Sequence, residues 1–239
     1  TLTLACSSAQ DTLTLTITQS DYDLAYITEG LTYSVDPVGH SNSDSDRTSF
    51  CGFTFSNNFD WTNGGFKQDS DGAAAFVVKK GNTITLPNSL FADSDAAGKT
   101  IDISFKITNS EQYDAVAIRD LNSTTTATAT KGIILRANNG EIRLDNVAGQ
   151  EFRYCEENRI DLSILVEALD AQDPQRITTV WLDGIPSKAN AYTTNTLVHT
   201  EGGTIIGSEY CDVWIYGIRT YNLALSKRDM IQNYISNGS

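Results

Sequence analysis

The sequence predicts an all-β fold, a two-sheet antiparallel sandwich that ends in a short C-terminal helix. Short runs rich in Val, Ile, Thr, Tyr and Phe recur along the 239 residues and are separated by Gly, Asn and Asp turns, a pattern typical of strands in all-β proteins. Hydrophobic residues make up 40% of the chain, which is enough for a sizeable core. Charged residues make up 20% and are spread along the chain, so its composition is not that of a disordered protein.

The chain begins with two runs in which Leu alternates with Thr, at residues 1–5 and 12–18. Alternation with a period of two predicts half-buried strands, and the polar link between the runs favours a hairpin. We therefore interpret residues 1–28 as an N-terminal β-hairpin extension. Residues 29–239 then form one sandwich domain, because no low-complexity linker divides them.

The first part of this domain contains the most polar stretch of the chain, residues 36–49, which we expect to be a loop. Strands follow at 73–78 and 83–86, joined by a turn that contains Gly81. Asn139-Gly140 and Asp183-Gly184 predict two more hairpin turns. The remaining predicted strands are 100–108, 115–120, 132–137, 141–146, 151–155, 159–168, 176–183, 186–192, 204–207 and 212–221. Strands at this spacing are expected for two stacked antiparallel sheets.

A helix is predicted near the C-terminus. Ser226 is a good N-cap, and Asp229 three residues later supplies the acidic half of a capping box. Four hydrophobic residues follow on one helical face, so we expect that face to lie against the sandwich. They are Met230, Ile231, Tyr234 and Ile235.

The net charge limits the partners of the chain. With 17 Lys and Arg residues against 30 Asp and Glu residues, the formal charge is −13. This charge opposes binding to nucleic acid and to anionic membranes. No apolar stretch approaches the roughly 18 residues of a membrane span, so we predict no membrane insertion. The first residue is not Met and no basic, apolar signal pattern follows it, so we expect the chain to be a piece of a longer protein.

Two strings in the C-terminal third resemble the laminin-G-like, concanavalin-A-like jelly roll. Residues 178–185 read TTVWLDGI, a strand followed by an Asp-Gly turn. Residues 218–226 read IRTYNLALS, a strand, a turn and the start of a helix. The resemblance covers roughly residues 30–239 and implies a jelly-roll sandwich with loops at its rim.

The string FDWTNGGF at residues 59–66, with ITLP at 84–87, is similar to the version of this fold found in bacteriophage virion proteins. This resemblance implies a non-catalytic structural or adhesion module on a phage tail or other exposed appendage. It would lie at the virion surface, contact other virion proteins and bind bacterial surface carbohydrate. The alternative is a carbohydrate-binding module of a secreted, extracellular bacterial enzyme or adhesin.

The sequence offers few groups for catalysis, so we predict that the protein is not an enzyme. Jelly-roll glycosidases place two carboxylates on one face of a strand. Here the nearest pair is Glu141 and Asp145, with no third acid following. The two histidines, His40 and His199, lie far apart in the sequence, and neither has a visible nucleophile beside it.

Four cysteines leave the redox state open. Cys6, Cys51, Cys155 and Cys211 form no C-x-x-C motif. Two disulfides, with three alternative connectivities, are one possibility. We favour four reduced thiols, because a sandwich of this size does not need disulfides for stability.

Calcium is the only cofactor that the sequence suggests. Asp36, Asp44 and Asp46 lie in the polar stretch 36–49, and calcium takes oxygen ligands from such loops. Laminin-G-like domains often hold calcium at the rim of the sandwich. A second acidic group, Asp60, Asp69 and Asp71, lies further along the chain. The alternative for both groups is solvated turn residues.

A carbohydrate site is predicted around Trp61, because sugars are recognised by an aromatic ring together with amides that bond the hydroxyl groups. Asn58 and Asn63 flank Trp61. Further aromatic candidates are Tyr113, Tyr154, Tyr192 and Tyr210. The alternative for Trp61 is packing beside a strand. Trp181 and Trp214 alternate with apolar neighbours, so we interpret both as structural.

Overall fold

The computed structural model describes residues 2–4, 13–15, 25–90, 98–110, 115–120, 134–138, 141–145, 150–152, 157–167, 175–193 and 203–237. The helices are α1 (Asp44–Ser49), the 3₁₀ turn η1 (Phe50–Gly52) and α2 (Lys227–Asn237). The strands are β1 (Leu2–Leu4), β2 (Leu13–Leu15), β3 (Leu31–Val35), β4 (Thr54–Phe55), β5 (Gly65–Gln68), β6 (Ala74–Val78), β7 (Ile84–Thr85), β8 (Lys99–Thr108), β9 (Ala115–Asp120), β10 (Ile134–Asn138), β11 (Glu141–Asp145), β12 (Gln150–Phe152), β13 (Ile160–Val166), β14 (Gln175–Leu182), β15 (Ile185–Thr193), β16 (Thr204–Ile206) and β17 (Asp212–Tyr221).

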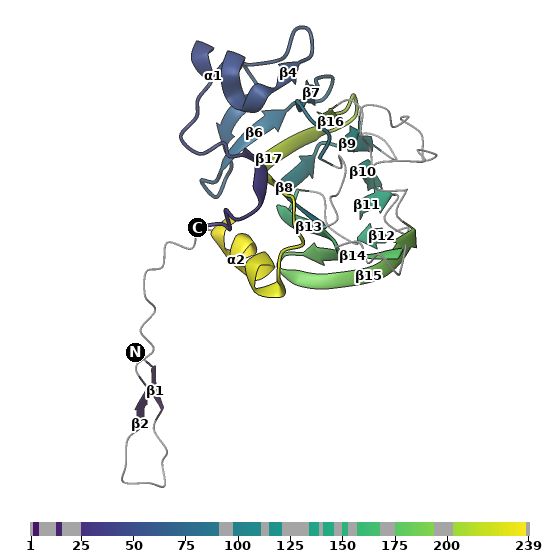
Figure 1. Cartoon of the computed structure of the whole chain (residues 1–239). Coiled ribbons are helices and arrows are strands. Elements are labelled where there is room, and N and C mark those ends of the chain that lie inside the picture. The colour runs from purple at the N-terminus through teal and green to yellow at the C-terminus, as the bar shows by residue number, and fades with distance from the viewer. Residues whose placement is uncertain are drawn as a thin grey trace.

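Two antiparallel sheets form the body of the protein, which confirms the predicted all-β sandwich with a C-terminal helix (Figure 1). Within the described residues, one sheet has the strand order β12-β11-β10-β9-β16-β7-β4. The other has the order β15-β14-β13-β8-β17-β6-β5, and β3 also pairs with β17. We call this second sheet the β17 sheet.

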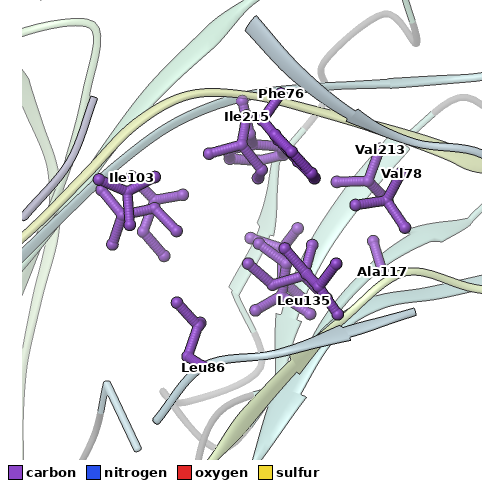
Figure 2. Close-up of a cluster of buried hydrophobic side chains, with 14 of the residues drawn as sticks. Phe76, Val78, Leu86, Ile103, Ala117, Leu135, Val213 and Ile215 are labelled. Atoms are coloured by element: carbon purple, nitrogen blue, oxygen red, sulfur yellow. The ribbon is translucent and has the colours of Figure 1, made fainter. Parts of the chain in front are cut away.

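The core lies between the sheets, where the inward-facing side chains of both sheets are buried. In β13, Ile160, Leu162, Ile164 and Val166 are buried and the residues between them are only partly so, as expected for a strand with one face on the core. Figure 2 shows side chains from both sheets in this core, with Phe76 and Ile215 from the β17 sheet and Ala117 and Leu135 from the other sheet. Burial of such side chains is the dominant favourable contribution to folding.

Strand β17 is shared by two neighbours along one edge. Its other edge pairs with β8 from Asp212 to Tyr221. On the shared edge, β6 pairs with Val213 to Ile215, and β3 pairs with Ile218 to Tyr221. The chain between β3 and β6 therefore leaves the sheet and returns to the same strand. It carries α1, η1, β4 and β5.

The prediction that residues 36–49 form only a loop is wrong in its second half, which contains α1. The Oγ of Ser43 accepts a hydrogen bond from the backbone N–H of Asp46 at 3.4 Å, so Ser43 caps the helix. A Ser followed three residues later by an acid is a recognisable helix start, but the surrounding Asp and Ser residues hide this signal. The helix has only 6 residues.

The predicted packing of α2 is also wrong for three of its four residues. Met230 is 1% exposed, but Ile231, Tyr234 and Ile235 are 44%, 38% and 44% exposed. Asn233 is buried instead, at 2% exposed. The helix packs Met230 on an apolar cluster with Trp181 and Tyr221. Beside this cluster the sheet presents Asp102, Asp161 and Arg219, which hydrogen-bond the asparagines of the helix. The predicted capping box is present, because the Oγ of Ser226 accepts the backbone N–H of Asp229 at 3.3 Å and the carboxylate of Asp229 accepts the backbone N–H of Ser226 at 3.2 Å.

Strands β1 and β2 pair in an antiparallel ladder, with Leu2 opposite Leu15 and Leu4 opposite Leu13. Residues 25–27 then lie against α2. The Nε2 of Gln232 donates to the carbonyl oxygen of Ala25 at 2.8 Å. The backbone N–H of Ile27 donates to Oδ1 of Asn233 at 2.8 Å. Within the described residues, neither helix is long and apolar enough to cross a lipid bilayer.

Candidate functional site

Two segments that the sequence treats separately meet at one end of the sandwich. They are α1 and the loop at residues 56–64, and Asn42 connects them. Its Nδ2 donates to the carbonyl oxygen of Trp61 at 3.2 Å, and its Oδ1 accepts from the backbone N–H of Phe66 at 2.7 Å. We call the surface formed by α1 and the 56–64 loop the α1–Trp61 surface. Figure 1 shows α1 and α2 at different ends of the sandwich.

Trp61 is half-buried and belongs to an aromatic cluster. Its ring centroid lies 4.9 Å from that of Phe55 and 4.8 Å from that of Phe59. The ring is also edge-on to Phe76 at 6.1 Å. The guanidinium of Arg47, from α1, lies 5.2 Å from the Trp61 centroid, within the range of a cation–π contact. The structure therefore places Trp61 in packing contact with the core edge while leaving part of the ring accessible.

Asn58 and Asn63 shape the turn around Trp61. Asn58 is exposed and has a φ of 64°, a left-handed conformation that Asn tolerates better than most residues. Asn63 is exposed, and its Nδ2 donates to Oδ2 of Asp60 at 2.8 Å. Oδ1 of Asp60 accepts the backbone N–H groups of Thr62 and Asn63, each at 3.0 Å. The backbone N–H and side chain of Asn63 are the main causes that lower the pKa of Asp60. This carboxylate therefore stabilises the turn that contains Trp61.

Two of the three residues considered as calcium ligands, Asp36 and Asp46, each accept a hydrogen bond from a nearby backbone N–H group. Oδ1 of Asp36 accepts the backbone N–H of Val38 at 3.0 Å. Oδ2 of Asp46 accepts the backbone N–H of Ser41 at 2.9 Å, which lowers the pKa of Asp46, as does His40. Asp44 starts α1, and its side chain lies outside the described residues. In the part of the chain that the structure describes, no three His, Cys, Asp or Glu side chains form a group that could hold a metal ion.

A row of cationic and aromatic side chains lies on the outer face of the β17 sheet and was not predicted from the sequence. The carboxylate of Asp69 accepts hydrogen bonds from Nζ of Lys106 and from the hydroxyl of Tyr216. Burial opposes ionisation of Asp69, but these hydrogen bonds hold its pKa down at about 2. Nζ of Lys106 lies 4.5 Å from the Trp214 ring centroid, and the Arg159 guanidinium lies 4.6 Å from that of Tyr216.

This row contains two residues that the sequence analysis considered, Trp214 and Asp69. Trp214 has the structural role predicted for it, since it packs on Lys106 across neighbouring strands. Asp69, considered as a calcium ligand, accepts the hydrogen bonds that hold Lys106 and Tyr216 together. Its spacing of two from Asp71 was visible in the sequence. Its partners, 37 and 147 residues away, were not.

Two cysteines, Cys51 and Cys211, lie in the described part of the chain, and Cys51 is a free thiol. Cys211 is buried and Cys51 is half-buried. Burial raises the pKa of the Cys51 thiol to about 11, so Cys51 is a weak nucleophile at neutral pH. Cys6 and Cys155 lie outside the described residues.

Other candidates lie wholly or partly outside the described part of the chain. Tyr113, Tyr154 and His199 lie outside the described residues, as does the Asn139-Gly140 turn. The side chains of Tyr192, Glu141 and Asp145 also lie outside them. Tyr210 is described and is 42% exposed.

Comparison with known proteins identifies the fold. No family model and no curated protein matches the chain. Among solved structures, the botulinum neurotoxin type G receptor-binding domain matches with a TM-score of 0.56 at 12% identity, over 87% of this chain and 51% of that one. The binding domain of botulinum neurotoxin DC matches in complex with rat synaptotagmin II (TM-score 0.56, 8% identity, 87% and 52% covered). It also matches in complex with SialylT (TM-score 0.55, 7% identity, 87% and 52% covered).

These similarities are at the level of the backbone. At such identities they show a shared β-sandwich fold and nothing of the site. The chain spans about half the length of each of these structures. The chain therefore has the sandwich fold that occurs in these binding domains.

Proposed function

We propose that this chain is a non-catalytic binding module that recognises carbohydrate through the α1–Trp61 surface. One observation carries the proposal. The accessible part of Trp61 lies beside the Arg47 guanidinium and in the same turn as the exposed amides of Asn58 and Asn63. A ring that offers apolar area, together with nearby amide and guanidinium donors, is the combination that a sugar requires.

The acids of this surface favour binding over catalysis. Asp60 accepts two backbone N–H groups and the Asn63 amide, and Asp46 accepts the Ser41 N–H. Hydrogen bonds to the ionised form lower the pKa of each carboxyl group. A general acid needs the opposite, a raised pKa. The solved structures of similar fold are named as binding domains, which also supports a binding role.

We further propose that the module is of the laminin-G-like jelly-roll kind and is displayed on a bacteriophage virion, where it contacts bacterial surface glycan. The strings at residues 59–66 and 218–226 support this. A second candidate is a carbohydrate-binding module of a secreted bacterial enzyme or adhesin. It is favoured by the similarity to receptor-binding portions of larger chains.

The test is a glycan array that includes bacterial surface polysaccharides and sialylated oligosaccharides, probed with the full chain and three variants. Arg47→Gln removes the charge, Asn58→Gly removes an amide while keeping the left-handed turn, and Trp61→Phe keeps an aromatic ring in the cluster. We expect each to weaken binding to the same glycans by about tenfold, as for contacts at the centre of a binding surface.

The matched control is Tyr210→Ala, which removes an exposed aromatic residue outside the α1–Trp61 surface. Its binding should equal that of the unmodified chain. Thermal melting of every variant distinguishes the loss of a glycan contact from the loss of the folded structure. If the array shows no glycan bound by the unmodified chain, or if only Tyr210→Ala loses binding, the proposal is wrong.

A further inference from the structure

A row of outward-facing residues crosses the β17 sheet from the α1–Trp61 surface. Gly65 on β5 pairs with Val77 on β6. Val77 in turn pairs with Trp214 on β17, which pairs with Lys106 on β8. The residues before and after Val77, Trp214 and Lys106 in their strands belong to the hydrophobic core. Because successive residues of a strand point to opposite faces of the sheet, the row itself lies on the outer face.

Trp61 meets this row at its Gly65 end. A Cβ on Gly65 would lie 2.9 Å from Cε3 of Trp61, so the indole occupies the space that a side chain would fill there. Two interstrand spacings, roughly 10 Å in all, separate Gly65 from Trp214. Val77 lies between them and is only 1% exposed although it faces outward. We call the area formed by Trp61, Val77 and Trp214 the two-tryptophan surface.

The Trp214 ring has one face turned to the protein. Nζ of Lys106 lies 4.5 Å from the ring centroid and also donates to the carboxylate of Asp69. Lys106 is 8% exposed, whereas Trp214 is half-buried, so the indole lies over the ammonium group and shields it from solvent. The structural contact with Lys106 therefore uses the inner face of the ring, and the accessible part of Trp214 is its outward side.

Hydrogen-bonding groups gather beside Trp214 on the carboxylate of Asp212, which precedes it by two residues in β17 and shares its face. Nζ of Lys79 donates to Oδ2 of Asp212, and Nδ2 of Asn109 donates to the same oxygen at 2.7 Å. Burial opposes ionisation of Asp212, but these hydrogen bonds and that of the Lys80 N–H lower its pKa. The ionised carboxylate thus fixes the half-buried Lys79 and the exposed Asn109, whose polar groups suit sugar hydroxyls.

We propose that the two-tryptophan surface binds a linear oligosaccharide, with one sugar on Trp61 and another, further along the same glycan chain, on Trp214. The inference rests on the proposed carbohydrate binding at Trp61 and names the class of ligand, a chain of several sugars as in a surface polysaccharide. The separation of the two rings is wider than one sugar ring. Once one sugar is bound the second contact is intramolecular, so affinity should rise with the length of the glycan.

The test follows the three tryptophans of the chain by NMR of their ¹⁵N-labelled indole groups, assigned with Trp61→Phe, Trp181→Phe and Trp214→Phe. The probes are bacterial capsular polysaccharides and lipopolysaccharide O-chains, cleaved by mild acid and sized into fractions from disaccharide to octasaccharide. The shortest fragments should shift only the Trp61 signal, and longer ones should shift Trp61 and Trp214. Trp181, 4% exposed and packed with Met230 of α2, is the internal control and should not shift.

Two variants test the contacts at the Trp214 end. Trp214→Phe reduces the ring, and Asn109→Gly removes the amide while keeping the left-handed backbone, whose φ is 53°. Each should weaken binding of the longer fragments by about tenfold and leave that of the shortest unchanged. The matched control is Ile235→Ser, which changes a 44% exposed residue of α2 at a different end of the sandwich (Figure 1). It should bind every fragment as the unmodified chain does, and melting midpoints check that each variant is folded.

The outcomes separate this inference from the proposed function. If the Trp61 signal shifts with every fragment while Trp214 never does, or if affinity does not rise with fragment length, the inference is wrong and binding at Trp61 stands. If no fragment shifts either signal, the proposed function fails and the inference fails with it. A shift of Trp214 without Trp61 overturns both, because it places the sugar at Trp214 alone.

Discussion

Asn233 on α2 and Asp102 on β8 are joined side chain to side chain at 2.6 Å, although they lie 131 positions apart in the sequence. Both are buried, at 2% and 4% exposed. Burial raises the pKa of Asp102, while Ser163, Asn233 and Arg219 oppose the rise. The position of the C-terminal helix thus depends on a buried carboxyl group in the middle of the β17 sheet.

Asn233→Ala should therefore destabilise the protein strongly. The substitution removes hydrogen bonds to Asp102, the Tyr221 hydroxyl and the Ile27 N–H, and leaves buried polar groups unsatisfied. We expect the free energy of unfolding, measured by urea titration, to fall by about 2–4 kcal/mol. Gln232→Ala, the neighbour with a bond to Ala25, should cost about 1 kcal/mol or less. Equal losses in both variants would contradict a special role for Asn233.

Asp69 should make the protein lose stability in acid. Its pKa is lowered from 3.8 to about 2 in the folded state, so its contribution is complete above pH 4 and is lost as the pH falls from about 4 to about 2. Asp69→Asn should be less stable than the unmodified protein at pH 7, and the difference should shrink across that window. Urea titrations at a series of pH values measure it. The control is Asp71→Asn, which changes an exposed acid in the same turn. This variant should lose stability between about pH 4 and about pH 2 just as the unmodified protein does.

Two glycines with the same backbone conformation should respond differently to a methyl group. Gly65 and Gly39 have φ values of 74° and 77°. A Cβ at Gly65 would lie 2.3 Å from Oδ1 of Asn42, whereas at Gly39 it meets nothing within 4 Å. Gly39→Ala should cost about 1 kcal/mol from backbone strain alone. Gly65→Ala should cost about 3 kcal/mol or more, because it also displaces the Asn42 clamp. Similar melting midpoints would show that the clamp is dispensable.

Cys51 should resist alkylation in the native protein. Its pKa of about 11 leaves very little thiolate at pH 8, and its Sγ donates to the carbonyl oxygen of Ser34 at 3.6 Å. Peptide mapping after iodoacetamide treatment should find the Cys51 peptide unmodified in buffer and modified in urea. Rapid native modification, or a Cys51 disulfide in the unreduced map, would contradict the structure.

The sheets were predictable because a strand with one buried face repeats every two residues. Strand β13 shows that repeat in its sequence and in its burial, and the predicted limits of β9 and β17 agree with the observed ones. The face of α2 was not predictable in this way. Hydrophobicity placed Ile231 and Ile235 inward, but Asp102, Asp161 and Arg219 on distant strands attract Asn233 and Asn237 instead.

The candidate site was predictable in part. The Trp61 turn and the acidic stretch before α1 both drew attention from composition alone. The contact between these two segments through Asn42 was not predictable, because Asn42 reaches residues about 20 positions away by hydrogen bonds to backbone atoms. The sequence also could not show that Arg47 lies over Trp61, since no short-range pattern links them.

The shared edge of β17 has a consequence for how this sandwich can diversify. Because β3 and β6 are held by consecutive stretches of one strand, the 36–73 excursion begins and ends at fixed anchor points. The excursion also supplies Phe50, Phe53 and Phe59 to the core, and its strand β4 pairs with β7 of the other sheet. A graft between Val35 and Ala74 that keeps these buried positions can therefore change the exposed surface at this end of the sandwich while the β17 ladders keep their register.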